Sequence, residues 1–390
     1  MNIHSVQILN DATGVYIHVP FCRSKCRYCG FYSELAADHD TNRLVSALVS
    51  ELDRYRAVGE VHTLYIGGGS PTSLPRQGAS TTSDLLVGLV AAVALRWPGR
   101  EEFTVECNPG QADAKTLSAL RELGVSRLSF GVQSFCDEEL MLLGRGHSVA
   151  QAKRSICEAR EVGFDNIGLD LIFAIPGSSL ASWEYSLKSA VETGVEHISA
   201  YSLSFEPGTA FNTARLAGEI EVVDEDTDRA MYDLAIDYLA SNEFVQYEIS
   251  NFAREGFACV HNQGYWDNRP FIGIGPSAGS YWQGVRSVNV SNIGLYISRI
   301  EAGLDAYEQC EYLDDNERIC ETAVLNLRSR KGVDLVRFRE TTGVDFLKVF
   351  AEPLERYGNL GLIEVDTEGV RLARGALAVA DSVLCDFSSI

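Results

Sequence analysis

Six apolar runs recur between residues 15 and 205, and each is followed by a segment with helix-like patterning. The runs are almost continuously apolar instead of alternating, as expected of strands buried on both faces of a parallel sheet. The intervening segments are long enough for right-handed helical crossovers. The pattern predicts an α/β fold, a partial (β/α)6 barrel similar to a TIM barrel. The runs read VYIHVPF, HTLYIGG, EFTVECN, RLSFGVQ, NIGLDLIFAIPG and HISAYSL.

Residues that pack poorly in a core follow most of these runs, as in PFC, GGGSP, ECNP and GVQS. In β/α barrels the carboxyl ends of the strands build the active site. We therefore expect the functional residues of this chain at that end of the barrel.

The chain has 390 residues, more than a single core usually supports. Past about residue 305 helical segments take over, followed by a hairpin-like stretch, LIEVDTEGVRLA, and a closing apolar helix. This part predicts a smaller helical domain compatible with a winged helix. We expect a barrel domain with its C-terminal extension over residues 1–300 and a second domain over residues 301–390.

The formal net charge of −21 argues against a sequence-independent hold on nucleic acid, because that binding depends on clusters of Lys and Arg. The longest apolar run, residues 85–95, is too short to cross a hydrocarbon core of about 30 Å and suits a buried helix. The first residues carry no pattern of a secretory signal. We expect a cytoplasmic protein with at most a peripheral contact with a membrane.

Three cysteines, Cys22, Cys26 and Cys29, lie together in FCRSKCRYCG, directly after the first run. Cytoplasmic thiols stay reduced, so a tight group of cysteines points to a metal and not to disulfides. Structural zinc sites are closed by a fourth Cys or His, usually in a second pair that this sequence does not supply. The spacing fits a 4Fe-4S cluster with one open iron, and zinc remains the alternative.

At these cysteines the sequence resembles the radical S-adenosylmethionine (SAM) superfamily, whose CxxxCxxC loop holds such a cluster. The resemblance implies that the open iron binds SAM. It also implies that a glycine motif after the second strand contacts the methionyl end of SAM, here Gly68, Gly69 and Ser70. Consecutive glycines let a backbone approach a ligand closely, although such a run is often only a tight turn.

Four more polar residues recur near strand ends, and a polar group among apolar strands is costly to bury without a partner. A bound ligand is one such partner, and a hydrogen bond within the barrel is the alternative. By resemblance we assign Glu106, Gln133, Arg145 and Asp170 to SAM. Arg145 as a clamp on the SAM carboxylate and Asp170 as an acceptor from the ribose are hypotheses.

The resemblance is closer to the oxygen-independent coproporphyrinogen III oxidase group, whose motifs appear in family order over residues 15–253. It implies that Tyr16 lies near the cluster and that Tyr28 packs along the adenine of SAM. Packing of both rings in an aromatic core is the alternative. The motifs are YIHVPFC, GGGSPTSL, E-x-N-P, RLSFGVQSF, R-G-H, NIGLDLIFAIPG, HISAYSLSFEPGT and YEISNFA.

Two marks of the true oxidases are missing. Phe31 stands where they have a further cysteine, and only fourteen residues precede the first run. The stretch HNQGYW, residues 261–266, is similar to the HNxxYW motif of the HemW heme chaperones, a branch of the same family. This resemblance implies a heme chaperone, with His261 as the candidate heme contact and a capped turn, whose His and Asn bond to the backbone, as the alternative.

We therefore expect a 4Fe-4S cluster, SAM and heme as cofactors, and a heme-acceptor protein and an electron donor as partners. The resemblance also implies a homodimer. The rival function is that of a radical SAM enzyme acting on a porphyrin, either a coproporphyrinogen III oxidase or an anaerobic heme-modifying enzyme. Gly30, where the commonest heme chaperones have Asp, keeps this rival open, and the sequence predicts no catalytic residue.

Overall fold

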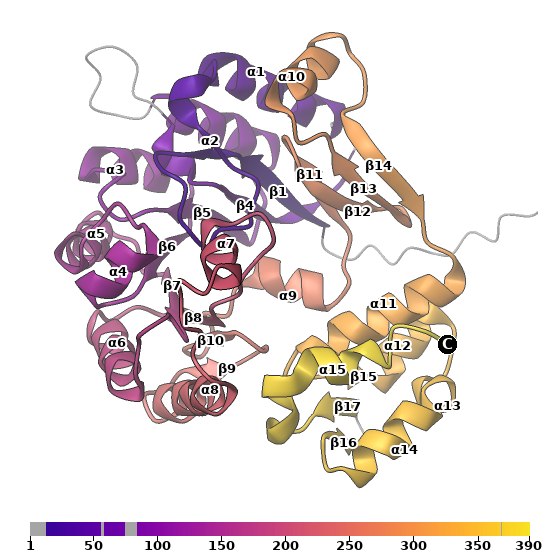
Figure 1. The fold of residues 1–390 in the computed structure, drawn as a ribbon. Coiled ribbons are helices and arrows are strands. Elements are labelled where there is room, and N and C mark those ends of the chain that lie inside the picture. Colours follow the sequence, from indigo (N-terminus) through magenta and orange to yellow (C-terminus); the bar gives the residue numbers. More distant parts are fainter. Residues whose placement is uncertain (1–12, 56–57, 75–83, 368) are drawn as a thin grey trace, which may run out of the picture.

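The computed structural model describes residues 13–55, 58–74, 84–367 and 369–390 (Figure 1). Six parallel strands form the centre of a large sheet, and they pair in chain order. These are the six predicted runs, so the α/β fold with a partial barrel is confirmed. The strands are β1 (Thr13–Val19), β4 (Val61–Gly68), β5 (Glu102–Cys107), β6 (Arg127–Gln133), β7 (Ile167–Phe173) and β8 (His197–Ser202).

Helices follow these strands and cover the outer face of the sheet (Figure 1). Most begin at an Asp, Ser or Thr whose side chain accepts the backbone N–H three residues on, as Asp113 does for Thr116. The apolar run at 85–95 forms α2, whose Leu86, Leu89 and Val93 are fully buried, as predicted. The helices are α1 (Thr41–Leu52), α2 (Asp84–Arg96), α3 (Ala114–Glu122), α4 (Asp137–Leu143), α5 (Val149–Glu161), α6 (Leu180–Glu192), α7 (Ala210–Leu216) and α8 (Glu225–Ala240).

The two faces of the barrel strands differ in character. Val15, Ile17 and Val19 of β1 point to the helices and are fully buried. The alternate residues point inward, and among them Tyr16 and Tyr65 are only half-buried. Polar and aromatic side chains therefore line the barrel interior, beneath the carboxyl ends of the strands where β/α barrels bind their ligands.

The sheet continues past the barrel on both sides. On one side β11 (Phe271–Ile274) pairs in parallel with β1, and β12 (Gly279–Trp282), β13 (Val285–Asn289) and β14 (Tyr307–Tyr312) follow as antiparallel strands. On the other side β10 (Asn251–Ala253) and β9 (Val245–Gln246) extend β8. Helices α9 (Val260–Trp266) and α10 (Ile293–Glu301) connect these strands. The predicted domain boundary at residue 300 falls before β14, and the division into domains stays a prediction.

The C-terminal part is helical with a small sheet. It holds α11 (Asp315–Arg328), α12 (Leu335–Thr342), α13 (Phe346–Val349), α14 (Ala351–Asn359) and α15 (Ala380–Cys385). The expected hairpin is β16 (Ile363–Val365) with β17 (Gly369–Leu372), and β15 (Val333–Asp334) joins it. Helices α13 and α14 are separated at Phe350, whose backbone leaves the helical range.

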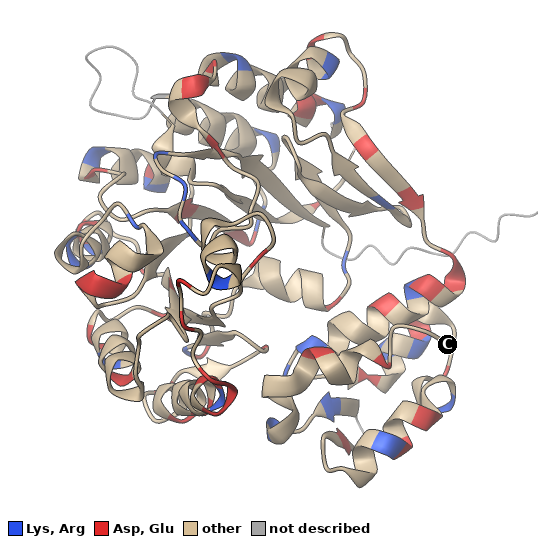
Figure 2. Cartoon of the chain, viewed as in Figure 1, with Lys and Arg blue, Asp and Glu red and all other residues tan. Residues whose placement is uncertain are grey.

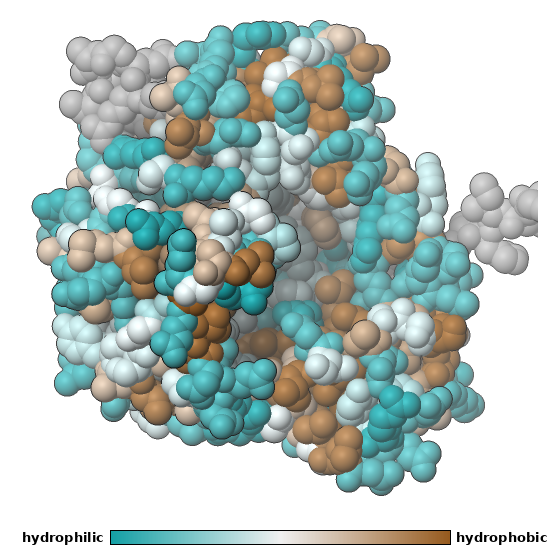
Figure 3. Space-filling view, viewed as in Figure 1, coloured by the Kyte–Doolittle hydropathy of each residue, from teal (hydrophilic) through white to brown (hydrophobic). Residues whose placement is uncertain are grey.

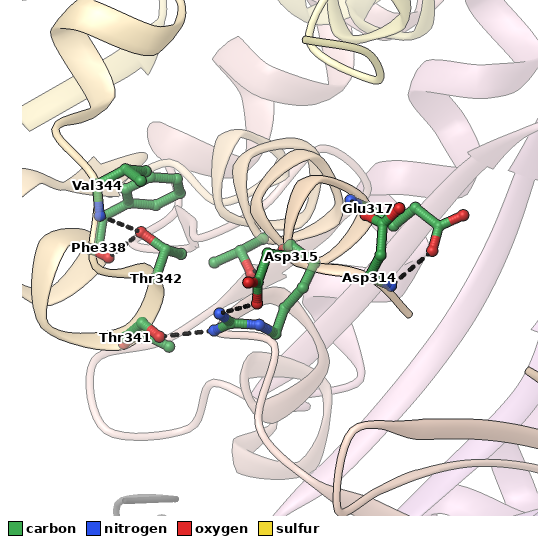
Figure 4. A network of polar contacts seen from close by, with 9 residues as sticks. Asp314, Asp315, Glu317, Phe338, Thr341, Thr342 and Val344 are labelled. Carbon is green, nitrogen blue, oxygen red and sulfur yellow. Dashed lines mark hydrogen bonds and ion pairs between the residues drawn. The ribbon is translucent and has the colours of Figure 1, made fainter. Parts of the chain in front are cut away.

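Local hydrogen bonds fix the start of this part (Figure 4). The Asp314 carboxylate accepts from the Glu317 backbone N–H, and Glu317 accepts from the Asp314 N–H, so a capping box begins α11. At the end of α12 the Thr342 hydroxyl donates to the Phe338 carbonyl at 2.7 Å. The helix boundaries therefore follow from the side chains at their ends.

Helix α9 contacts both parts of the molecule. The Asn326 side chain of α11 donates to the Trp266 carbonyl at 2.8 Å, and Asn268 donates to the Thr322 hydroxyl at 2.9 Å. Arg328 of α11 lies over the Trp266 ring. The C-terminal part is therefore attached to the barrel through the end of α9.

Among the described residues, no helix is both long enough and apolar enough to span a bilayer.

Candidate functional site

The three motif cysteines lie on a loop at the carboxyl end of β1, as predicted from their position in the chain. Backbone hydrogen bonds hold this loop from two sides, because Arg27 N–H donates to the Leu143 carbonyl of α4 and Phe211 N–H of α7 donates to the Arg27 carbonyl. Cys22, Cys26 and Cys29 are half-buried and form no disulfide. The fold therefore fixes three free thiols at the mouth of the barrel.

The surroundings of these thiols fit a positively charged group. Burial raises the pKa of Cys22 to about 11, and burial also raises the pKa of Cys29. Thiolates here need nearby positive charge, which iron supplies, and Arg145 Nη1 already donates to Cys26 Sγ at 3.2 Å. In the described parts of the chain, no three His, Cys, Asp or Glu side chains lie close enough to hold a single metal ion. A four-iron cluster binds each cysteine through a different iron and needs no such convergence.

The glycine turn after β4 leaves no room for side chains next to the cysteine loop. A Cβ on Gly69 would lie 2.7 Å from the Phe21 carbonyl oxygen and 3.0 Å from Cys22 Sγ. A Cβ on Gly67 would lie 2.8 Å from the Glu106 carboxylate, and Gly68 has a φ of +119°, which favours glycine. The glycines thus bring the backbone against the cysteine loop, and their contact with SAM stays a prediction.

Ser70, the third predicted residue of this turn, is buried and has internal partners. Its backbone N–H donates to the Phe21 carbonyl at 2.7 Å, and its hydroxyl donates to Gln111 Oε1 at 2.9 Å. Gln111 comes from the loop after β5 and was not expected from the sequence. The side chain of Ser70 therefore stabilises the turn, and a contact between Ser70 and SAM stays a prediction.

Glu106 points into the barrel from the end of β5. Its carboxylate accepts from the Tyr65 hydroxyl at 2.8 Å and from the Gly68 backbone N–H at 3.1 Å. Burial raises the pKa of Glu106 to about 7, against the effect of these two bonds. Glu106 thus ties the glycine turn to the barrel interior.

Arg145 follows α4 and lies between the cluster loop and the barrel strands. Its guanidinium donates to the Gly131 carbonyl at 2.7 Å, to Asn108 Oδ1 and to Cys26 Sγ. Its Nε is buried without a partner in the described structure. Arg145 is therefore held beside the cysteines, and its role as a clamp for the SAM carboxylate stays a prediction. Asn108 lies in the quoted E-x-N-P motif but was not singled out.

Gln133 is the last residue of β6, whereas Asp170 lies in the middle of β7 and not near its end, where it was expected. Gln133 has a φ of +72°, a conformation that side chains rarely adopt and that is found at functional sites more than elsewhere. Its amide nitrogen is 2.9 Å from the position of a Cβ on Gly131, the residue whose carbonyl Arg145 binds. Burial raises the pKa of Asp170, while a bond from Ser199 and the charges of Arg127 and Arg145 oppose the rise.

Of the two predicted tyrosines, Tyr28 lies in the cysteine loop and Tyr16 lies on β1. The Tyr28 hydroxyl interacts electrostatically with Arg145 and Cys26, while burial raises the pKa of this hydroxyl. Tyr16 points inward, and its hydroxyl bonds His18 Nδ1 at 3.0 Å. His18 was not expected from the sequence. The polar partner of Tyr16 shows that it is not purely an apolar core residue.

His261 lies away from the cysteine loop, beside the start of β4. It is 3% exposed on α9 and bonds Thr63 Oγ1 through Nδ1 at 2.8 Å and the Tyr265 hydroxyl through Nε2 at 2.9 Å. Thr63 is near the amino end of β4, whereas Gly68, at the other end, adjoins the cysteine loop. Burial lowers the pKa of His261 to about 3. The heme contact stays a prediction, and it requires one of these two hydrogen bonds to break.

Comparisons with known proteins identify what this chain is similar to. The model of the radical SAM superfamily matches residues 16–190, and that of the HemN C-terminal domain matches residues 313–379. The heme chaperone HemW of Bacillus subtilis is 34% identical over 95% of this chain and 98% of its own length. That of Lactococcus lactis is 31% identical over 97% and 98%. The structure of coproporphyrinogen III oxidase (HemN) from Escherichia coli matches with a TM-score of 0.83 over 98% of this chain and 92% of that one, at 21% identity.

Proposed function

We propose that this chain, which belongs to the heme chaperone HemW family of the radical SAM superfamily, binds heme and transfers it to an acceptor protein. The observation that carries the proposal is the 34% identity to the Bacillus subtilis chaperone over almost the full length of both proteins. The likeness to HemN, at 21% identity, concerns the fold alone. Phe31, 74% exposed next to the third cysteine, supports the chaperone because the true oxidases have a cysteine there.

The family implies a 4Fe-4S cluster and SAM, and we propose that Cys22, Cys26 and Cys29 hold the cluster. When bound, such a cluster supplies an open iron for SAM and a one-electron couple. The protein's own residues fix the positions of the three cysteines and of the groups around them. Arg145 places a positive charge at the thiolates, and Gly69 lets the backbone approach them.

We further propose that SAM lies over the carboxyl ends of the barrel strands, against the glycine turn and near Tyr28. There Glu106 and Asp170 offer acceptors, and Gln133 offers an amide. These three side chains come from three neighbouring strands, β5, β6 and β7. Convergence from several strand ends is typical of binding sites in β/α barrels.

Heme needs a wide apolar surface. Figure 3 shows a recess between α7 and the C-terminal part, with apolar side chains gathered along its lower rim. Tyr265 and Trp266 belong to α9, which lies beside this part of the molecule (Figure 1). We propose that heme enters here and that His261 contacts it once α9 has opened.

The acceptor, an electron donor, a homodimer and a cytoplasmic location, where thiols stay reduced, belong to the same proposal.

Titration of the oxygen-protected, iron-loaded protein with heme tests the proposal. We expect a saturable shift of the Soret band that is weakened in His261→Ala, whose replacement removes the ring nitrogens that bond Thr63 and Tyr265. An unchanged titration in His261→Ala would disprove the role of that residue. A parallel incubation with coproporphyrinogen, SAM and reductant is expected to give no protoporphyrinogen. Stoichiometric product would replace the chaperone by the oxidase, and zinc without iron would overturn both.

A further inference from the structure

A cavity of about 350 Å³ opens at the amino end of the barrel, at the opposite end of β4 from the cysteine loop. One side is formed by the start of β4 and the residues before it (58–62), and the other by the end of α2 and the turn after it (96–99). No residue that we assign to the cluster or to SAM lines this cavity. Its size is in the range of pockets that bind cofactors and other small molecules.

Arg96 gives the cavity a positive charge that lacks an acceptor. Its Nη2 is buried and has no hydrogen-bond partner among the residues that the structure describes. A guanidinium nitrogen removed from water without an acceptor is costly, so the cavity favours a ligand that carries an anionic group. A carboxylate suits this position, because it accepts N–H bonds from a guanidinium in fixed geometry.

Apolar side chains form the rest of the wall beside Arg96. Val58, Val61 and Trp97 line the cavity, and the Arg96 guanidinium lies 5.9 Å from the centre of the Trp97 ring. A small inorganic anion would fill the polar corner and leave these apolar groups in contact with water. A ligand with a carboxylate and a flat apolar body satisfies both parts of the wall.

His62 adds a group that binds metal ions. Its side chain is 39% exposed, and its Nε2 lies 3.8 Å from the carboxylate of Glu60. A carboxylate beside one ring nitrogen is the usual partner of a metal-binding His, because it orients the ring and leaves the other nitrogen for the metal. The backbone under His62 is held in place, since its carbonyl accepts from the Glu101 N–H at 2.7 Å.

The cavity adjoins the small pocket that holds His261, because His62 lines both. Both ring nitrogens of His261 are hydrogen-bonded and the residue is 3% exposed, so it cannot take iron while α9 is closed. His62 is accessible in that same state. Arg269 lines the smaller pocket, and its Nε is a second buried guanidinium nitrogen without a partner in the described part of the chain.

We propose that this cavity is a second heme position, used while α9 is closed, in which His62 binds the iron and Arg96 binds a propionate. Heme combines a flat apolar ring, two carboxylates and an iron that takes an imidazole ligand. The proposal rests on the proposed function, because it takes heme as the cargo. It is separate from the recess beside the C-terminal part, where His261 is reached only after α9 has opened.

The test compares His62→Ala and Arg96→Met with the matched controls His39→Ala and Arg154→Met, a half-exposed His and an exposed Arg outside the cavity. Each oxygen-protected, iron-loaded protein is titrated with ferric heme and, separately, with iron-free protoporphyrin. Arg96→Met is expected to weaken the binding of both by about tenfold, because one charge-assisted hydrogen bond is lost. The two controls are expected to match wild type.

His62→Ala is expected to weaken the binding of heme and to leave that of iron-free protoporphyrin unchanged. The absorption and electron paramagnetic resonance spectra of the bound heme are expected to lose the signature of imidazole ligation, and added imidazole is expected to restore it. A purely structural role of His62 would not respond to imidazole, so restoration distinguishes a ligand from a residue that only supports the fold.

Unchanged titrations in both His62→Ala and Arg96→Met would overturn the second heme position. An unaltered heme spectrum in His62→Ala, with weaker protoporphyrin binding in Arg96→Met, would show a carboxylate site without an iron ligand and would also contradict the proposal. If wild type binds no heme, the proposed function fails and the second position fails with it. If wild type binds heme and only His261→Ala weakens the binding, the proposed function stands and the second position alone fails.

Discussion

Replacement of Gly69 by Ala isolates the close approach between the glycine turn and the cysteine loop. The added Cβ would lie 2.7 Å from the Phe21 carbonyl oxygen and 3.0 Å from Cys22 Sγ. The carbonyl cannot yield easily, because it accepts bonds from the Ser70 N–H and the Ser73 hydroxyl, both at 2.7 Å. Gly69 does not have a positive φ, so backbone strain would not explain a loss of stability in Gly69→Ala. The substitution therefore tests the close contact alone.

The expected cost follows from overpacking. Insertion of a methyl group into a filled site costs about 1–3 kcal/mol, and here the groups that must move include a cysteine of the cluster loop. We expect Gly69→Ala to lower the free energy of unfolding of the cluster-free protein by about this amount. Iron and sulfide per chain after anaerobic reconstitution are expected to fall as well, because Cys22 is displaced.

The matched control is Gly88→Ala. Gly88 lies in α2, is exposed, and has nothing within 4 Å of an added Cβ. Alanine there is expected to stabilise the helix by about 1 kcal/mol and to leave cluster content unchanged. Denaturant unfolding and iron analysis measure both effects. Normal stability and full cluster content in Gly69→Ala would refute the packing of the turn against the loop.

Two further predictions concern buried carboxylates. Glu51→Ala is expected to cost about 3–5 kcal/mol in unfolding free energy, because Glu51 is 2% exposed and accepts from Gly275 N–H, Asn289 and Tyr296, which would lose their acceptor. Denaturant unfolding beside the exposed control Ser50→Ala measures this, and a loss below 1 kcal/mol would contradict it. For Glu106, burial raises the folded-state pKa from 4.5 to about 7. Between these two pH values the folded protein holds a proton on Glu106 that the unfolded chain releases, so the stability that this proton contributes is lost as pH rises toward 7. The stability of Glu106→Gln relative to wild type is therefore expected to rise between pH 5 and pH 8 by at most about 3 kcal/mol, and a constant difference would show that the pKa is not raised.

The sequence predicted what depends on local pattern. Six apolar runs became six parallel strands, because continuous burial on both faces leaves a direct signature in each run. The position of Cys22, Cys26 and Cys29 at a strand end followed from the same pattern. Arg145 is placed beside them through α4, whose last residues bind the loop backbone.

Contacts between distant residues were not predictable in this way. Glu51 meets Gly275, Asn289 and Tyr296 only because α1 packs on the far strands of the sheet, and no local pattern joins these positions. His261 carries the same limitation. Its motif suggested a ligand, whereas its burial and its bond to Thr63 depend on where α9 meets the barrel.

Helix α9 is hydrogen-bonded to both parts of the molecule. One end of its hydrogen-bond chain holds Thr63 on β4 through His261, and the other end holds Asn326 of α11 through Trp266. The strand that begins beside His261 ends in the glycine turn against Cys22. A displacement of α11 would therefore be transmitted through Trp266, His261 and β4 to the glycine turn, and so to the loop that carries the three cysteines.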